Sequence, residues 1–251
     1  MSVNLRTVLA ELRAHADPRN VEGMARYGIR SARAYGVPSP VIQRIARGVG
    51  RDHALAARLW ETGILEARAV AALIDDPRLV GGAQMERWVA QFDSWAICDH
   101  VCGKLFDRTP LAWAKARAWS RRRAEFTRRA AFALVAWLAV HDKQAPDASF
   151  LPFLPIIERA AADERPMVKK AVNWALRQIG KRNRSLNGHA IACAERLRRQ
   201  PSAAARWVAA DALRELRSAA VQQRLRCRHA LTPMSAGISA TIGPIRCREN
   251  P

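Results

Sequence analysis

Trp95 and Asp99 are four residues apart in a segment with a helical pattern, so an indole and a carboxylate share one helix face. The chain around them is strongly basic, with 42 Lys and Arg against 22 Asp and Glu and a formal net charge of +20. A negative side chain weakens a surface that holds polyanions. Asp99 is therefore expected either to form an ion pair or to take part in chemistry that requires a carboxylate.

The ion-pair interpretation has two candidate partners, Arg128 and Arg129, on a separate predicted helix. The face that carries Asp99 continues to Cys102 and Phe106, so apolar neighbours would partly shield the carboxylate from water. The residue pattern alone favours the ion pair, and chemistry stays the alternative.

Other residues with chemical potential fit structural roles better. Cys98, His100 and Cys102 alternate like metal ligands, but a helix turns His100 about 200° away from either cysteine. We expect these cysteines to be small buried side chains, and we predict no metal site and no cofactor. Gly48-Val49-Gly50 lacks the third glycine and the preceding strand of a nucleotide-binding loop.

Composition indicates a globular protein with a polyanionic partner. Apolar residues make up 49% of the 251-residue chain, which allows a substantial core. The net charge favours nucleic acid over an acidic membrane surface, and compositional drift toward arginine is the alternative explanation. Five irregularly spaced cysteines and an N-terminus without a signal peptide's apolar segment predict a reducing, cytoplasmic location. No apolar run approaches the ~20 residues that a membrane crossing requires.

Helical periodicity runs through nearly every segment, and the alternation of Val, Ile and Thr that is typical of strands is almost absent, which predicts an all-α protein. Breaks divide the chain into helices of about 10 to 16 residues joined by short turns. The breaks fall at Gly36-Val37-Pro38, Asp75-Asp76-Pro77, Gly81-Gly82, Thr109-Pro110, Ala145-Pro146-Asp147, Asp163-Glu164-Arg165-Pro166, Gly180 to Asn183 and Gln200-Pro201-Ser202.

The second half of the chain contains an internal repeat. Residues 169–177 align without a gap with residues 206–214, and a weaker echo begins at Arg128. A period of roughly 40 residues is typical of two-helix units such as HEAT repeats, which stack into a curved ribbon. We therefore predict a curved, HEAT-like helical-repeat solenoid with a basic concave face.

The helix predicted over residues 166–181 has a polar face that combines an indole with cations. This polar face contains, at the spacing i, i+4, i+7 and i+11, the residues Lys170, Trp174, Arg177 and Lys181. The apolar face carries Val168, Val172, Leu176 and Ile179. Trp174 either faces a ligand or covers the edge of the core, and the pattern leaves this open.

The domain organisation follows from where the repeat ends. The helical pattern fades after Arg217, and the last residues are rich in Ser, Pro, Gly and Thr with isolated basic residues. We predict one all-helical domain over residues 1–217 and a basic, disordered tail over residues 218–251.

Four short segments occur in a recognisable order: Met24-Ala25-Arg26-Tyr27 followed by Tyr35-Gly36-Val37-Pro38-Ser39-Pro40; Trp95-x-x-x-Asp99; Arg128-Arg129-Ala130-Ala131; and Lys170-Ala171-Val172-Asn173-Trp174-Ala175-Leu176-Arg177. In these segments the chain resembles the AlkD-like DNA alkylation-repair glycosylases, an all-helical family built of HEAT-like repeats. The resemblance runs from about Met24 to Leu216. The stretch from His141 to Pro155 departs from it, because it is several residues longer than expected.

The resemblance implies a DNA-facing cleft lined by Trp95, Asp99, Arg129 and Trp174. Tyr27 falls where the family tends to keep an aromatic residue near the DNA. We expect further DNA contacts from Arg128, Lys169, Lys170, Arg177 and Lys181. The implied partner is double-stranded DNA with alkylated bases, bound by a monomer associated with the nucleoid.

The activity implied by the resemblance is release of N3- or N7-alkylated purines from DNA. Such a base is already cationic, so the enzyme needs no strong general acid. Asp99 would stabilise the positive charge that develops on the deoxyribose and position the attacking water. Trp95 and Trp174 would pack on sugar and backbone, and Arg129 would grip a phosphate or orient Asp99. No lysine stands out as a Schiff-base nucleophile, which favours a monofunctional glycosylase.

Two other functions share some of these features. A helical-repeat protein that binds damaged or branched DNA, or RNA, without catalysis would have the same charge, repeats and tryptophans. It would gain nothing from a carboxylate that faces phosphates. A protein-binding solenoid would not need the excess of Lys and Arg.

Overall fold

The computed structural model describes residues 4–29, 31 and 33–230, which form helices and no strands, so the predicted all-α class is confirmed. The helices in chain order are α1 (Leu5–Ala14), α2 (Pro18–Arg26), α3 (Ser39–Val49), α4 (His53–Glu61), α5 (Leu65–Ile74), α6 (Gly82–Ala90), α7 (Trp95–Lys104), the 3-10 helix η1 (Phe106–Arg108), α8 (Ala112–Trp119), α9 (Glu125–His141), α10 (Asp147–Phe150), α11 (Phe153–Ala160), α12 (Pro166–Gly180), α13 (Arg184–Arg198), α14 (Ala203–Leu216) and α15 (Ala219–Ala230). None of the helices in this described part is long and apolar enough to cross a lipid bilayer.

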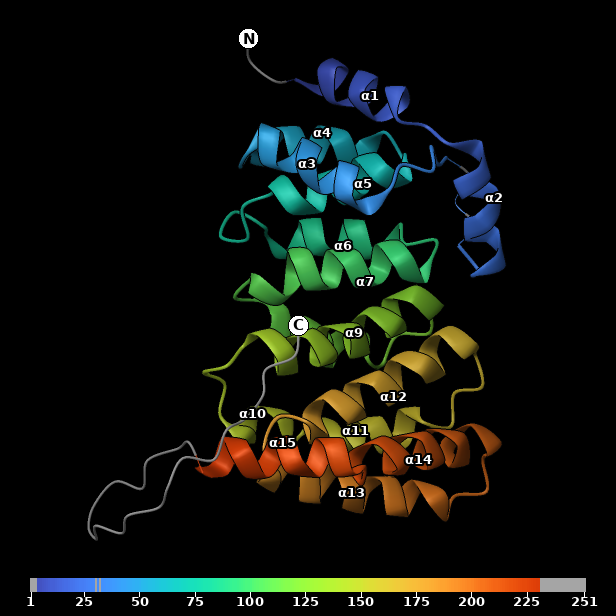
Figure 1. Ribbon diagram of the computed structural model, residues 1–251, viewed down its shortest axis with the longest axis vertical. Coiled ribbons are helices and arrows are strands. Elements are labelled where there is room, and N and C mark those ends of the chain that lie inside the picture. The colour runs from blue at the N-terminus through green and yellow to red at the C-terminus, as the bar shows by residue number, and fades with distance from the viewer. Residues whose placement is uncertain (1–3, 30, 32, 231–251) are drawn as a thin grey trace, which may run out of the picture.

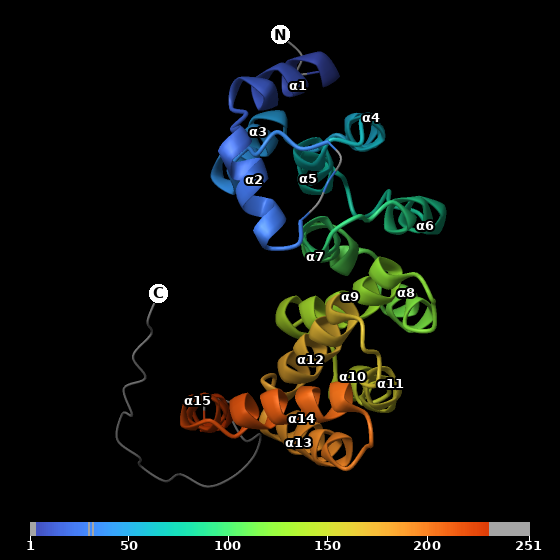
Figure 2. The ribbon, with the colours of Figure 1, turned by 90° about the vertical axis from the view of Figure 1, so that its right-hand side faces the viewer.

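From α4 to α14 the helices are stacked along the length of the molecule (Figure 1), in two layers that are seen side by side in Figure 2. We call α5, α7, α9, α12 and α14 the inner helices, and each of them contacts the next one in the stack. Figure 2 shows α4, α6, α8 and α11 along the other side, and we call these the outer helices. This stack of helix pairs is the arrangement that the internal repeat predicts.

Several helices begin at the residues that the turns of the sequence supply. The side chains of Asp52 and Asn183 accept hydrogen bonds from the backbone N–H groups of Leu55 and Leu186, both at 2.8 Å, at the starts of α4 and α13. Pro166 occupies the first turn of α12, where its missing N–H costs nothing. The predicted breaks that contain Pro166 and Asn183 therefore act as helix starts, whereas the start at Asp52 was not among the predicted breaks.

The two repeated segments lie in α12 and α14, which are neighbouring inner helices. The Asn173 amide donates to the Asp211 carboxylate at 2.6 Å, and the Arg177 guanidinium lies 2.5 Å from the Glu215 carboxylate. Equivalent faces of successive repeats therefore meet through polar contacts at the edge of the core. The apolar face predicted for α12 is also confirmed, because Val168, Val172, Leu176 and Ile179 are all buried.

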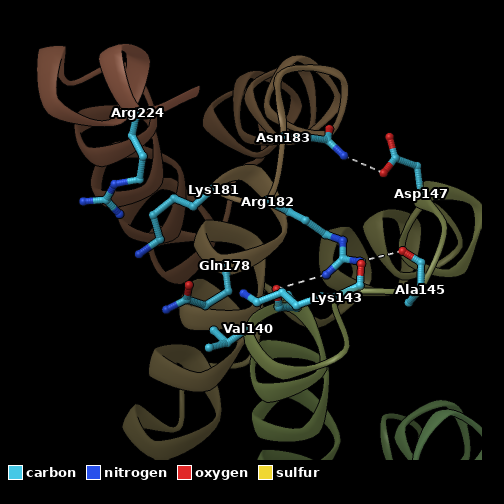
Figure 3. A pocket seen from close by; sticks show the side chains of 10 residues that line it. Val140, Lys143, Ala145, Asp147, Gln178, Lys181, Arg182, Asn183 and Arg224 are labelled. Atoms are coloured by element: carbon cyan, nitrogen blue, oxygen red, sulfur yellow. Dashed lines mark hydrogen bonds between the residues drawn. The ribbon is translucent and has the colours of Figure 1, made fainter. Parts of the chain in front are cut away.

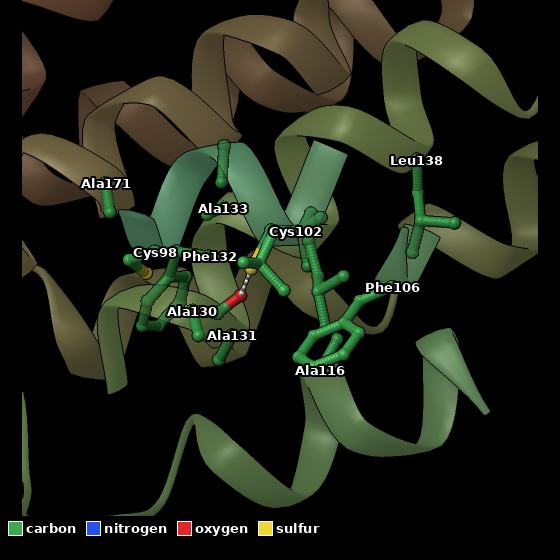
Figure 4. Close-up of a cluster of buried hydrophobic side chains, with 14 of the residues drawn as sticks. Cys98, Cys102, Phe106, Ala116, Ala130, Ala131, Phe132, Ala133, Leu138 and Ala171 are labelled. Atoms are coloured by element: carbon green, nitrogen blue, oxygen red, sulfur yellow. Dashed lines mark hydrogen bonds between the residues drawn. The ribbon is translucent and has the colours of Figure 1, made fainter. Parts of the chain in front are cut away.

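Small buried residues allow the middle inner helices to approach one another closely (Figure 4). Ala130, Ala133 and Ala171 are fully buried between α7, α9 and α12. Cys98 and Cys102 are buried among them as predicted, and their thiols contact the carbonyl oxygens of Phe126 and Ala130. Side chains of this size keep the helix axes close, which brings the polar residues of α7, α9 and α12 within reach of one another.

The C-terminal boundary differs from the prediction. A further helix, α15 (Ala219–Ala230), follows α14, so the disorder predicted for residues 218–251 is wrong for this part. The physical reason is a short apolar stripe, in which Val221 and Leu225 are one turn apart and both buried. α15 packs against α13 and α14. The rest of the predicted tail, from residue 231 onward, lies outside the described residues.

The close contact of α12 with the next repeat makes Gly180 sensitive to substitution. A Cβ at this position would lie 2.6 Å from Leu216 Cδ2 and 2.9 Å from Ala190 Cβ, inside ordinary contact distance. We expect Gly180→Ala to lower the free energy of unfolding by roughly 1–3 kcal/mol, measured by urea denaturation.

The matched control for this prediction is Gly188→Ala. Gly188 lies inside α13, and a Cβ there would meet no atom within 4 Å. Alanine should therefore raise the free energy of unfolding by about 0.5–1 kcal/mol through helix propensity alone. A Gly180→Ala variant as stable as the unmodified chain would contradict the packing described here.

Candidate active site

One cleft contains all four residues that the sequence places in a common site. It has a volume of about 630 Å³ and is lined by Arg26, Tyr27, Gly28, Trp95, Asp99, Arg129, Met167, Lys170 and Trp174. The lining residues come from the end of α2 and from the inner helices α7, α9 and α12. The structure therefore brings the predicted catalytic residues together, and Tyr27 and Lys170 join them.

The Asp99 carboxylate is held by the Arg129 guanidinium through two hydrogen bonds. Arg129 Nε donates to Asp99 Oδ1 at 2.9 Å, and Arg129 Nη2 donates to Oδ2 at 2.6 Å. Arg129 Nη1 donates to the backbone carbonyl of Met167 at 2.7 Å. Arg129 is thus a link between α7, α9 and α12, and its three nitrogens serve protein partners. Of the two roles predicted for it, this geometry favours the orientation of Asp99 over a grip on phosphate.

The ion pair is largely enclosed, yet the carboxylate keeps an opening to solvent. The side chains of Asp99 and Arg129 are 19% and 7% exposed. Burial raises the pKa of Asp99 above its ordinary value of 3.8, and the hydrogen bonds and charge of Arg129 oppose that rise. Arg129 itself stays cationic, because its pKa is raised by Asp99 despite the opposing effect of burial.

The two predicted indoles are positioned differently. Trp95 Nε1 donates to the backbone carbonyl of Tyr27 at 2.8 Å, which ties the start of α7 to the end of α2. No residue of α2 is buried, and the Tyr27 side chain is 72% exposed. Trp174 lies edge-on to the ring of Trp137, with ring centroids 5.3 Å apart. Trp174 therefore covers the edge of the core and also lines the cleft, and its contact with a ligand stays a prediction.

Trp137 is a structural residue of the site that the sequence analysis did not single out. Its Nε1 donates to the backbone carbonyl of Asp99 at 3.0 Å. Its indole fills the space beside Gly103, where any Cβ would overlap the ring. It also stacks on His141, whose Nδ1 lies 2.5 Å from Asp107. The available signal was its position on α9 two turns after Arg129, on the same helix face.

The arginine beside Arg129 has another partner. Arg128 Nη1 lies 3.2 Å from the Asp163 carboxylate, which also binds Arg165 at 2.6 Å. Arg128 does not line the cleft, although the sequence analysis included it among the DNA-binding residues. The choice of Arg129 as the residue beside Asp99 therefore agrees with the geometry.

Three further cations predicted to bind DNA also lie outside the cleft. Arg177 and Lys181 both contact Glu215 at 2.5 Å, so part of the polar face of α12 is used for contact with α14. Lys169 lies over the ring of Trp207, 5.0 Å from its centroid. The helical pattern of the sequence could not predict these contacts, because it does not reveal which side chains a neighbouring helix presents. Their DNA contacts stay a prediction.

The sequence of the chain matches a known protein family over most of its length. The model of the DNA alkylation repair enzyme family matches residues 8–216. The chain belongs to the DNA alkylation repair enzyme family. That range contains every residue of the cleft and ends before α15. No curated protein matches this family member in sequence.

Two solved structures were found to align with this DNA alkylation repair family member. One is described as "A new family of proteins related to the HEAT-like repeat DNA glycosylases with affinity for branched DNA structures"; it aligns with a TM-score of 0.70 and 21% identity over 77% of this chain and 83% of that chain. This likeness confirms the HEAT-like helical-repeat fold. A designed armadillo repeat protein in complex with the peptide (KR)4 aligns at a TM-score of 0.34 and 14% identity, over 91% of this chain and 89% of that chain.

The difference between the two adjacent arginines can be tested by unfolding. Arg129→Ala removes the partner of an enclosed carboxylate and should lower the free energy of unfolding by roughly 3–5 kcal/mol. Arg128→Ala should cost only about 1 kcal/mol, since its pair is partly exposed and Asp163 keeps Arg165. Urea denaturation at neutral pH measures both values. Equal losses of unfolding free energy in the two variants would contradict the structural role given to the pair of Arg129 and Asp99.

Proposed function

We propose that the chain is a monofunctional DNA glycosylase that hydrolyses the N-glycosidic bond of N3- and N7-alkylated purines in double-stranded DNA. The observation that carries the proposal is the Asp99 carboxylate, oriented by Arg129 within a cleft that two indoles also line. Membership of the DNA alkylation repair enzyme family supports it.

Asp99 can stabilise a developing positive charge even though it is paired with Arg129. A carboxylate has about four lone-pair sites, and Arg129 occupies one on each oxygen. The remaining lone pairs are available to a water molecule and to the deoxyribose. As the bond to the cationic base stretches, the sugar becomes oxocarbenium-like, and a fixed carboxylate stabilises it more than it stabilises the ground state. The bonding electron pair leaves with the base, which becomes neutral, and the water held by Asp99 attacks the sugar carbon and gives its proton to the carboxylate.

The other residues of the cleft have complementary tasks. The Trp95 N–H is already bonded to the Tyr27 carbonyl, so Trp95 offers its ring rather than its donor. Trp95 and Trp174 pack against the deoxyribose and its backbone, and their faces attract a cationic lesion. Lys170 and Arg26 line the same cleft and bind the flanking phosphates. The exposed Tyr27 ring lies at the rim, next to the DNA.

A second candidate is a DNA-binding protein without catalysis. The structural relative with the TM-score of 0.70 is described as having affinity for branched DNA structures, which favours this function. Such a protein would also need the cations of the cleft. It would not need a carboxylate there, because a negative charge lowers affinity for phosphates.

Base release from methylated DNA separates the two candidates. We expect the chain to release 7-methylguanine from duplex DNA and Asp99→Asn to lose at least ~100-fold in rate, the scale of a lost electrostatic partner of the transition state. Glu158→Gln is the matched control, since this acid of α11 pairs with Arg196 of α13, away from the cleft. No release above the uncatalysed background would eliminate the glycosylase, and full activity in Asp99→Asn would eliminate the role of Asp99.

DNA affinity should respond in the opposite direction to the rate. Removal of the Asp99 charge lowers repulsion of the phosphates, so Asp99→Asn should bind duplex DNA as tightly as the unmodified chain or more tightly. Fluorescence anisotropy with undamaged duplex measures this. A large loss of affinity would mean that the substitution disturbs the cleft, and the lost rate could then not be assigned to chemistry.

The rate should also depend on pH through Asp99. The ionised carboxylate is the active form, and burial raises its pKa above the ordinary 3.8. Base release should therefore fall as pH decreases, and the fall should begin at a higher pH than for an ordinary aspartate. Single-turnover rates, corrected for spontaneous release at each pH, measure the acid limb. If the residual rate of Asp99→Asn decreases over the same pH range, the pH dependence belongs to a group other than Asp99.

A further inference from the structure

A second cavity lies at the opposite end of α12 from the cleft. Its volume is about 770 Å³, and it is lined by Ala139, Val140, Lys143, Ala145, Asp147, Gln178, Lys181, Arg182, Asn183 and Arg224. These residues come from the end of α9, the loop that follows it, the start of α10, the end of α12 and α15. We call this cavity the α15 pocket.

The lining of the α15 pocket is strongly basic. Four of its residues are cations, and Asp147 is its one carboxylate. The Asn183 amide donates to Asp147 at 2.6 Å, so this acid is oriented toward the wall of the pocket. Figure 3 shows Lys143, Gln178, Lys181 and Arg224 reaching toward the same space. Lys181 also contacts Glu215 at 2.5 Å, which reduces the positive charge without removing it.

Arg182 gives the pocket a rigid wall. Its guanidinium donates to the backbone carbonyls of Ala139, Lys143 and Ala145 at 3.3, 3.1 and 2.6 Å. It also lies 4.6 Å from the centroid of the Phe150 ring. These contacts fix the loop between α9 and α10, which carries Lys143. The position of the Lys143 backbone at the mouth of the pocket is therefore built into the fold.

The family match ends before α15, and the rest of the lining of the pocket lies within the matched range. Arg224 belongs to α15, which follows the range 8–216 matched by the family. Lys143 lies in the loop between α9 and α10, inside that range. Arg224 therefore adds to the pocket a cation from beyond the matched range. Both side chains are exposed, so they are positioned to meet a ligand.

The α15 pocket and the cleft lie along the same helix. α12 supplies Lys170 and Trp174 to the cleft and Gln178 to the pocket, and Lys181 follows directly at its end. Lys170 and Lys181 are separated by about 16 Å along the helix axis, at 1.5 Å per residue. This equals the axial rise of about five base pairs of duplex DNA. A duplex that lies along α12 would therefore span the distance between the two sites.

We propose that the α15 pocket binds a backbone phosphate of DNA, several base pairs from the deoxyribose that lies at Asp99. The position of the DNA rests on the proposed function, whereas the chemistry of the pocket does not. Arg224 and Lys143 contact the phosphate oxygens, and Arg182 holds the loop in place. The second contact adds affinity that does not depend on base identity or damage.

The salt dependence of DNA binding tests the proposal. The double variant Lys143→Ala with Arg224→Ala should bind an undamaged duplex less tightly, and its plot of log affinity against log salt should be less steep by about 1 to 2. Arg58→Ala with Arg87→Ala is the matched control. It removes the same charge from exposed positions on the outer helices α4 and α6. A slope and affinity equal to those of this control would overturn the proposal.

Undamaged duplex keeps this test independent of base release. A chain that binds DNA through the α15 pocket but releases no base would retain this inference and lose the proposed glycosylase. If the chain releases base but the double variant does not change the salt dependence of DNA binding, the proposed glycosylase is retained and this inference is lost. Circular dichroism and thermal unfolding of both double variants ensure that the comparison is between folded proteins.

Inorganic phosphate distinguishes a DNA backbone from a free phosphorylated compound. Titration of phosphate into the DNA-free protein should shift the Arg224 side-chain NMR signal, identified by its absence in Arg224→Ala. Phosphate should also compete with duplex more strongly in the unmodified chain than in the double variant. A shift of Arg224 without any change in DNA affinity between the variants would assign the pocket to a free phosphate compound and overturn the assignment to DNA.

Discussion

The contact between Asp99 and Arg129 is the interaction on which the site depends. It joins α7 to α9, and the bond from Arg129 to the Met167 carbonyl extends it to α12. An enclosed charge is stable only when it is paired and hydrogen-bonded, so these helices must keep their register for either residue to be tolerated. The small residues Ala130 and Ala171 make that register possible, because larger side chains would hold the helices too far apart.

The first question raised by the sequence was whether Asp99 forms an ion pair or performs chemistry. The structure shows the ion pair, and it also places the pair on the wall of an open cleft. The two explanations are therefore compatible. A carboxylate fixed by two hydrogen bonds needs little reorganisation when charge develops beside it, which is the condition for electrostatic stabilisation of a transition state. The same contact that stabilises the fold prepares the group for the proposed reaction.

Periodicity and the internal repeat were sufficient to predict the helices, the stack and the buried face of α12. The family resemblance was needed to place Trp95, Asp99, Arg129 and Trp174 in one cleft, since no helix pattern shows which faces of separate helices meet. Neither source predicted Glu215 as a partner of Arg177 and Lys181, because that contact depends on side chains of the next repeat. α15 was missed because a stripe of only two buried residues, Val221 and Leu225, gives a weak periodic signal.

The hydrogen bond from Trp95 to Tyr27 ends on a main-chain oxygen. Every amino acid provides that acceptor, so the tether between α7 and α2 places no demand on the identity of residue 27. The Tyr27 side chain, 72% exposed, is equally unconstrained by packing. Evolution can therefore exchange the residue at the rim of the cleft without a cost in architecture. Position 27 is a place where substrate range can diversify while the rest of the site stays unchanged.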